Sequence, residues 1–229
     1  FYTQPWGGPA KADTLSYLCR HGTTFSNAYT SCPLCVPSRM SMLSGLLPSR
    51  TGILTNSASL PDTIPTFLHC LVSSGYETVL IGRMHFIGQN QRHGFTKRLG
   101  GDITPVGYFR PETQWKRERG IFCDAFEVPG SIQFCGGGNS PVLAYDRHII
   151  ETAATYLRQD HKKPQCIVVG TYAPHFPYVA PPKLYFKYKE IIKLPEQFYD
   201  SSVYNPLLER RRIRISEEHQ LAVLSAYCG

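Results

Sequence analysis

The residues with the clearest capacity for chemistry lie in one short stretch, Cys35-Val36-Pro37-Ser38-Arg39. Proline is tolerated in the first turn of a helix, because its missing N–H costs no hydrogen bond there. Pro37 therefore predicts a helix that begins at this point, with Cys35 at about its N-cap. We expect this helix to have an apolar side and to end at a glycine and a proline; the residues concerned are Met40, Leu43, Leu47, Gly45 and Pro48.

Such a placement predicts an anion-binding pocket. The free backbone N–H groups and the positive end of the helix dipole favour an anion at a helix N-terminus. Arg39 follows Cys35 by four residues, so the two side chains can reach the same face. A reactive group beside a guanidinium is suited to a tetrahedral oxyanion such as sulfate or phosphate. Cys32 and Cys35 also spell Cys-x-x-Cys, which leaves a redox pair or half of a zinc site open.

Two later segments carry further candidates, each after an apolar run typical of a buried parallel strand. Residues 78–81 lead into Arg83 and His85, whose i, i+2 spacing in extended chain directs both side chains the same way. Residues 166–171 lead into His175, in a loop rich in proline and aromatic residues. A histidine taken alone at such a place is more often structural. Ligands bind at the carboxyl ends of strands in α/β sheets, however, so the three segments together predict one site.

These segments carry a resemblance to a known family. Cys-x-Pro-Ser-Arg, then x-x-x-Leu-x-Gly and Pro-x-Arg-Thr-Gly, resembles the signature of the type I sulfatases and runs without a gap from 35 to 52. A second run is similar to the choline-sulfatase branch of that family, and its residues are Gly82 to Gly88, Gln91, His93 to Phe95, Asp102 and Ile103. Arg83 stands where the family usually has lysine, and its planar fork is not equivalent to an ammonium. His175-Phe176-Pro177 resembles the segment of the family's second active-site histidine.

The resemblance implies a sulfuric ester hydrolase that uses a formylglycine made from Cys35 by a maturation enzyme. One hydroxyl of the hydrated aldehyde would attack the sulfur of a small alkyl or aryl sulfate ester, choline-sulfate-like, while His175 protonates the leaving alcohol. His85 would then take a proton from the second hydroxyl. Arg39 and Arg83 would stabilise charge on the sulfate oxygens. A phosphonate or phosphate monoester hydrolase on the same scaffold is the first alternative.

The resemblance also implies a divalent metal, usually Ca2+, with Mg2+ or Mn2+ as alternatives. Formylglycine at position 35 would be one ligand, and we expect the others outside this chain, because it contains no Asp-Asp pair. The implied fold is α/β, an alkaline-phosphatase-like mixed sheet between helices, incomplete at both ends. Residues 1–229 would then be a single partial catalytic domain, and we expect such a fragment to be inactive by itself.

The remaining segments are predicted from their periodicity and their turn residues. The expected elements are a helix capped by Asp13 and ending near His21, a strand at 24–29, a helix from Ile64 to Val72 closed by Gly75, a helix after Ser140 and a helix from about Ser216. The third of these helices should turn Ile149, Ile150, Ala153, Ala154 and Leu157 inward. Residues 96–140 read as a long insertion or lid, with a flexible turn at 136–138. Tyr185, Tyr188 and Tyr199 are expected to pack.

The composition limits the classes of protein to which this chain can belong. With 42% hydrophobic and 18% charged residues, the chain is ordinary for a globular protein, and no apolar run is long enough to cross a bilayer. The net charge of +7 is dispersed, apart from 210–214, and suits an enzyme for small anionic esters better than a nucleic-acid or membrane binder. Of the eight cysteines, Cys70 and Cys166 lie in apolar runs, which predicts buried thiols and a cytoplasmic location. A homo-oligomer is left open.

Overall fold

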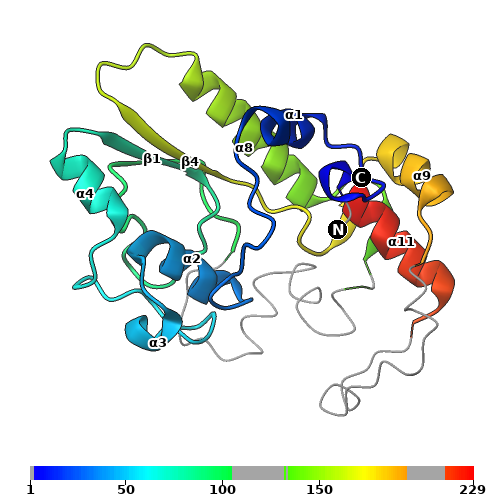
Figure 1. Ribbon diagram of the computed structural model, residues 1–229, viewed down its shortest axis with the longest axis horizontal. Helices are drawn as coiled ribbons and strands as arrows, with labels where there is room; N and C mark the ends of the chain where they lie inside the picture. Colours follow the sequence, from blue (N-terminus) through cyan, green and yellow to red (C-terminus); the bar gives the residue numbers. More distant parts are fainter. Residues whose placement is uncertain (1–2, 105–131, 133, 195–214) are drawn as a thin grey trace. The chain divides into compact units, whose positions relative to one another are not determined.

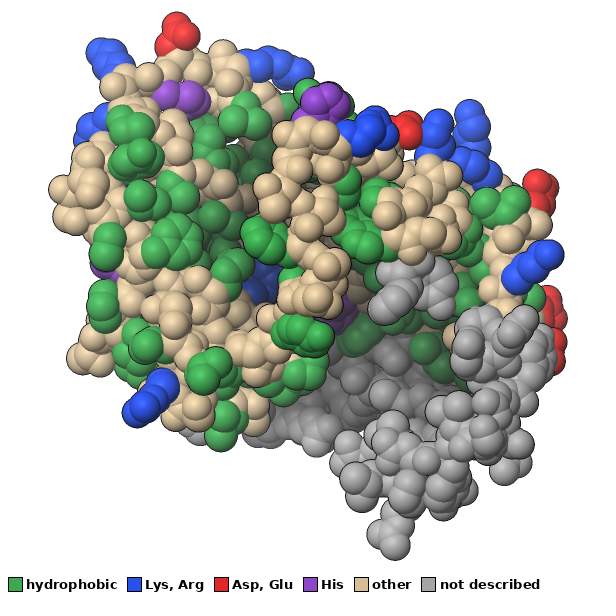
Figure 2. Space-filling view, viewed as in Figure 1, with side chains coloured by type: hydrophobic (Ala, Val, Ile, Leu, Met, Phe, Trp, Pro, Cys, Tyr) green, Lys and Arg blue, Asp and Glu red, His purple; other side chains and the backbone are tan. Residues whose placement is uncertain are grey.

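The computed structural model describes residues 3–104, 132, 134–194 and 215–229. These residues form two compact units. The sheet unit holds residues 27–104 and 144–172, and the terminal unit holds 3–26, 132, 134–143, 173–194 and 215–229. No helix in the described ranges combines the length and apolar character needed to cross a membrane. On the face shown in Figure 2, the described lysine and arginine side chains are dispersed.

The sheet unit is built on three parallel strands in the order β2–β1–β4. The central strand β1 (Glu77–Gly82) lies between β2 (Lys97–Leu99) and β4 (Gln165–Gly170), and Figure 1 shows β1 and β4 side by side. The register aligns Gly82 with Gly170, so both strands end at the same edge. The two strands predicted from apolar runs are confirmed. Only β1 is continuously buried, because Val169 on β4 is 44% exposed.

Helices cover both faces of this sheet, since successive residues of a strand point to opposite sides. Val79 and Ile81 pack against α8 (Pro141–Leu157), whose buried residues there include Ile149. Leu80 packs in a second cluster with residues of α2 (Cys35–Ser44) and α4 (Phe67–Ser73). Full burial of each such aliphatic side chain contributes about 1.5–3 kcal/mol. The α/β architecture predicted from the sequence is therefore present.

The terminal unit contains a short parallel pair, β3 (Cys135–Gly137) with β5 (Tyr178–Ala180). Its helices are η1 (Gln4–Trp6), α1 (Asp13–His21), α9 (Pro182–Ile191) and α11 (Glu217–Cys228). Tyr188 on α9 and Leu224 on α11 share one buried cluster, and Tyr185 lies in a second. Packing of Tyr185 and Tyr188 is confirmed, whereas Tyr199 lies outside the described residues. The helix predicted from about Ser216 is α11, and Ser216 caps it by accepting the backbone N–H of His219.

Two segments have a different secondary structure from the one predicted. Residues 24–29 form no strand, because the chain turns at 26–27 and leaves Phe25 and Tyr29 77% and 90% exposed. The triple glycine at 136–138 is not a flexible turn, since its first two residues belong to β3. A Cβ atom on Gly137 would lie 2.9 Å from the ring of Tyr185, so the glycine serves close packing of this strand.

Other predictions differ in boundary or in the face that is buried. The helix expected from Ile64 begins at Phe67, because Thr66 and His69 form a capping box after Pro65, and its C-cap is Ser74 and not Gly75. Asp13 lies inside the first turn of α1, whose N-cap is Ala12. The predicted burial is wrong at four side chains. On α8, Ile150 and Leu157 are exposed, and Tyr156 is buried instead. Of the two thiols expected to be buried, Cys70 is exposed and Cys166 is partly exposed. Helix α9 was not predicted.

The expected insertion at 96–140 is described only in part. Residues 105–131 and 133 lie outside the described residues, as does the arginine cluster at 210–214. At the beginning of this segment, residues 97–99 form β2, and near its end residues 135–137 form β3. A single partial catalytic domain over 1–229 stays a prediction.

Candidate active site

The helix that carries the signature begins where the sequence predicted, within one residue. Cys35 is the first residue of α2, and the N-cap is Leu34, whose carbonyl accepts the N–H of Ser38. The helix ends at Gly45, which adopts the left-handed conformation with φ 71°. Met40 and Leu43 are buried, whereas Leu47 is 59% exposed beyond the helix.

The N-terminus of α2 offers fewer free donors than the sequence suggested. The Oδ1 atom of Asn56 accepts the N–H of Val36 at 2.9 Å, and Pro37 has no N–H to offer. Asn56 therefore acts as a cap supplied from 20 residues away. An anion bound here would therefore be held mainly by the guanidinium groups beside it.

The structure brings three predicted residues together at the end of β1. The Nη2 atom of Arg83 lies 3.8 Å from Cys35 Sγ and 3.2 Å from His85 Nδ1. Arg83 is 3% exposed and His85 is 7% exposed. Because a guanidinium can only donate, Nδ1 of His85 accepts this hydrogen bond, and the neutral ring carries its proton on Nε2.

Two glycines allow Arg83 to occupy this position. The N–H of Arg83 donates to the carbonyl of Gly170 at 2.8 Å, which extends the pairing of β1 with β4 by one bond. A Cβ atom on Gly82 would collide with that carbonyl, and one on Gly170 would collide with the carbonyl of Arg83. Gly82 also has φ 89°, a region that favours glycine. The close approach of the two strand ends therefore requires both glycines.

The Arg83 guanidinium is fixed by a residue that the sequence analysis missed. Its carbon Cζ lies 4.5 Å from the ring centroid of Tyr172, which is 4% exposed, in a cation–π contact. The backbone N–H of Tyr172 donates to Asp146 Oδ1 at 2.6 Å. Nε of Arg83 is buried and has no hydrogen-bond partner among the described residues. The guanidinium is thus held in place, and its Nε–H group has no acceptor among the described residues.

Arg39 adds a second positive charge to this neighbourhood. Burial lowers the pKa of its guanidinium, nearby Arg83 lowers it further, and the charges of Cys35 and Asp102 act in the opposite direction. A lowered pKa means that burial and the nearby Arg83 disfavour the positive charge of Arg39. An oxyanion bound between Arg39 and Arg83 would relieve this repulsion, which favours anion binding at this site.

His175 belongs to the terminal unit and is described within it. It follows the cis peptide bond Ala173-Pro174 and precedes the cis bond Phe176-Pro177. Its ring lies 4.0 Å from that of Phe176, and its Nδ1 donates to the Phe176 carbonyl at 3.1 Å in the neutral form that bears the proton there. The role of His175 as the acid for the leaving alcohol stays a prediction.

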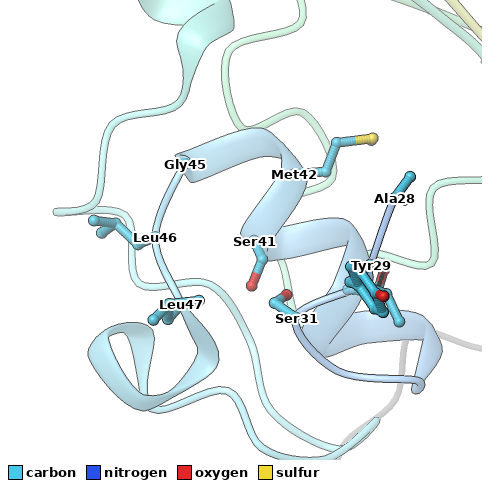
Figure 3. Close-up of a pocket in the computed structure, with 10 residues that line it drawn as sticks. Ala28, Tyr29, Ser31, Ser41, Met42, Gly45, Leu46 and Leu47 are labelled. Atoms are coloured by element: carbon cyan, nitrogen blue, oxygen red, sulfur yellow. Dashed lines mark hydrogen bonds between the residues drawn. The ribbon is translucent and has the colours of Figure 1, made fainter. Parts of the chain in front are cut away.

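An open cavity of about 570 Å³ also borders α2. Figure 3 shows Ser31 and Ser41 beside this space together with Leu46 and Leu47. None of its lining residues carries a charge, and none is a predicted site residue. The cavity is therefore distinct from the cluster of cationic side chains at Cys35.

The residues described around Cys35 do not fit a calcium site. Calcium takes six to eight oxygen ligands, whereas the side chains near Cys35 are guanidinium and imidazole groups. Within the described ranges, no group of three or more His, Cys, Asp or Glu residues could hold a metal ion. Cys32 and Cys35 form no disulfide.

Comparison with known proteins identifies the family. The sulfatase family model matches residues 6–204. A choline-sulfatase from Rhizobium meliloti (strain 1021) is 36% identical over 197 residues, 80% of this chain and 38% of that protein. Arylsulfatase K from Xenopus laevis is 26% identical over 174 residues, 75% of this chain and 30% of that protein.

The structural comparison supports the same fold. The phosphonate monoester hydrolase of Agrobacterium radiobacter superposes with a TM-score of 0.64 at 16% identity, over 96% of this chain and 51% of that one. This likeness shows the alkaline-phosphatase-like α/β fold that the sequence implied. The chain spans about 30–51% of the length of these relatives. By its signature, its fold and its match over most of its length, the chain belongs to the sulfatase family.

Proposed function

We propose that the protein is a sulfuric ester hydrolase that releases sulfate from a small alkyl or aryl sulfate ester. The choline-sulfatase match supports a choline-sulfate-like substrate. The observation that carries the proposal is the buried Arg83 guanidinium, whose Nη2 lies 3.8 Å from Cys35 Sγ. A permanently charged donor at that distance from a nucleophile can donate hydrogen bonds to the oxygens of a tetrahedral anion that is bonded to the nucleophile.

In this proposal, Cys35 is oxidised to formylglycine by a maturation enzyme. Its thiol sulfur marks the place of the new oxygen, and the modified residue supplies the hydroxyl that attacks sulfur. Arg83 and Arg39 bind the sulfate oxygens and stabilise the charge that gathers there. One such donor typically contributes about 2.7–4 kcal/mol to the transition state.

The hydrogen bond between Arg83 and His85 suggests how His85 changes role. With Arg83 donating to Nδ1, the proton of the neutral ring is on Nε2, where it can be donated to an oxygen. A bound sulfate group competes for Nη2 of Arg83. When that hydrogen bond opens, the lone pair of Nδ1 is free to accept a proton. His85 is then able to act as the base of the second step, and His175 is proposed as the acid of the first.

The metal is proposed for the whole protein. Its expected identity is Ca2+, with Mg2+ or Mn2+ as alternatives, and its oxygen ligands would come from groups other than those described around Cys35. Its charge would add to that of the two arginines in binding the sulfate group.

A phosphonate or phosphate monoester hydrolase is the second candidate. The structural likeness to a phosphonate monoester hydrolase favours it, and guanidinium groups alone do not distinguish one tetrahedral oxyanion from another. A redox or zinc-binding module built on Cys32 and Cys35 is the third. The contact of Arg83 with both Cys35 and His85 has a direct role in either ester hydrolase, whereas a redox or zinc module gives it none.

The test is a substrate comparison with full-length protein co-expressed with a formylglycine-generating enzyme. We expect choline sulfate or p-nitrophenyl sulfate to be hydrolysed with a higher kcat/KM than p-nitrophenyl phenylphosphonate or p-nitrophenyl phosphate. A preference for the phosphonate would move the assignment to the second candidate. An absence of turnover on all four esters, with formylglycine present at position 35, would contradict both.

A further inference from the structure

The backbone that follows β1 contains an unusual turn. His85 has φ 59°, in the left-handed region that residues with a Cβ atom rarely adopt. This conformation turns the imidazole back toward Arg83, so that Nδ1 meets Nη2 at 3.2 Å. The position of His85 therefore depends on whatever holds the turn.

A single carboxylate holds it. Oδ2 of Asp102 accepts the backbone N–H of Met84 at 3.0 Å and that of His85 at 2.6 Å. Two consecutive N–H groups that converge on one oxygen form an anion-binding concavity of the kind made by a residue in the left-handed conformation. Asp102 lies 17 residues beyond His85, so this is a long-range anchor rather than local turn chemistry.

The Asp102 carboxylate is itself fixed on its other side. Its Oδ1 accepts the backbone N–H of Thr104 at 2.8 Å and also the Thr104 hydroxyl. Arg98 places Nη2 3.9 Å from Oδ2, and the Asp102 side chain is 3% exposed. With both oxygens already accepting hydrogen bonds in a buried position, this carboxylate is poorly placed to act as a base. Its effect on the site must pass through the groups that it holds.

We propose that Asp102 is a positioning residue for the reaction, because its carboxylate locks the left-handed turn that directs His85 toward Arg83. The inference rests on the proposed function and deepens it. It also gives Asp102 an electrostatic part, since it supplies negative charge close to Arg39. Without this anchor, His85 would relax to an ordinary backbone conformation and lose its hydrogen bond with Arg83.

The first test is Asp102→Asn in the full-length matured protein. An asparagine keeps the shape but cannot accept with both ends, so its amide nitrogen would face either Thr104 N–H or the N–H groups of Met84 and His85. We expect kcat to fall about 10- to 100-fold while KM changes less than about threefold, because both arginines still bind the ester. Thr104→Val removes only one hydrogen bond to Oδ1 and should give a smaller loss of the same kind, which keeps the test usable if Asp102→Asn folds poorly.

Thr66→Val is the matched control. Thr66 is buried in the same unit, and its hydroxyl donates to the His93 carbonyl at 2.8 Å, so it too anchors backbone. In the described part of the chain, its side-chain hydrogen bonds are to His69 and His93 and not to Cys35, Arg83 or His85. We expect a lowered Tm with unchanged kcat. The proposal would fail if Thr66→Val and Asp102→Asn showed the same loss of kcat for the same loss of Tm, because Asp102 would then be merely structural.

The second readout does not depend on activity. Amide hydrogen exchange, followed by mass spectrometry on peptides that cover 84–85, should be faster in Asp102→Asn than in the wild type or Thr66→Val. Unchanged exchange at these two amides would overturn the proposal whatever the kinetics. If exchange is faster in Asp102→Asn but the wild-type protein hydrolyses no sulfate ester, the anchor is supported and the proposed function is contradicted. The two failures are therefore distinguishable.

Discussion

Replacing Arg83 tests how the site binds its anion. Arg83→Ala removes the donor that lies 3.8 Å from Cys35 Sγ and also the hydrogen bond to His85 Nδ1. The loss of one charged donor costs about 2.7–4 kcal/mol, so kcat/KM should fall about 100- to 1,000-fold. Arg83→Lys restores the charge but not the planar fork, which holds two partners and stacks on Tyr172. We expect it to retain measurable activity, about tenfold below the wild type, or 1.4 kcal/mol.

The assay is steady-state hydrolysis of p-nitrophenyl sulfate by full-length matured protein, with Tm measured for each variant. Arg92→Ala is the matched control, because Arg92 is an exposed arginine of the same unit, and its kcat/KM should stay within about twofold. Equal and mild effects of Arg83→Ala and Arg83→Lys would refute the reasoning, since a donor that touches the transition state cannot be both removed and replaced at the same small cost.

Three further predictions follow from other contacts. Cys35→Ser should abolish sulfatase activity, because a serine needs a different maturase, while Cys32→Ser should retain most of it. Zinc content and thiol titration are measured alongside activity, and equal losses of activity in the two variants would favour a redox or zinc pair. Tyr172→Leu keeps an apolar side chain but removes the ring from Arg83. The kcat/KM should fall about 30-fold, because a desolvated cation–π contact contributes about 2 kcal/mol, and an unchanged value would show that the stacking has no role. The hydrogen bond from Lys97, followed by that from Tyr156, lowers the pKa of Glu77 from 4.5 to about 2 in the folded state. Its contribution to stability is therefore complete above pH 4.5 and is lost as the pH falls toward 2, so Glu77→Gln should flatten that part of the stability curve in urea titrations, and parallel curves would contradict it.

Local pattern was sufficient to predict the elements that carry the site. The apolar run before Arg83 identified β1. Arg83 and His85 lie together as expected, but through a left-handed turn at His85 and not through the extended chain that the i, i+2 argument assumed. Pro37 and Gly45 gave the bounds of α2 within one residue. These features depend on a few neighbouring residues, whose conformational preferences are strong.

The contacts that the sequence analysis missed join residues far apart in the chain. Tyr172 meets Arg83 only because β4 pairs with β1 in a parallel register, which no local pattern specifies. Asn56 caps α2 and Asp102 holds the turn at His85 across 20 and 17 residues. A carboxylate soon after β2 was the available signal for Asp102, but it does not name its partner.

The wrong predictions have a related cause. Alternation at 24–29 predicted a strand, but a strand needs a neighbour to pair with, and here the side chains of Phe25 and Tyr29 remain in solvent. Glycines at 136–138 suggested a turn, whereas the ring of Tyr185 is what requires a residue without a Cβ atom at Gly137. In both cases tertiary packing overrode the local preference.

The most direct test of the central claim is the mass of the peptide that contains residue 35, taken from the same preparation of full-length matured protein whose sulfate release is measured. The account predicts formylglycine at position 35, a free thiol at Cys32, and sulfate release that rises in proportion to the modified fraction. Robust sulfate release from protein in which Cys35 is an unmodified cysteine, or a disulfide between Cys32 and Cys35 in the active fraction, would contradict it.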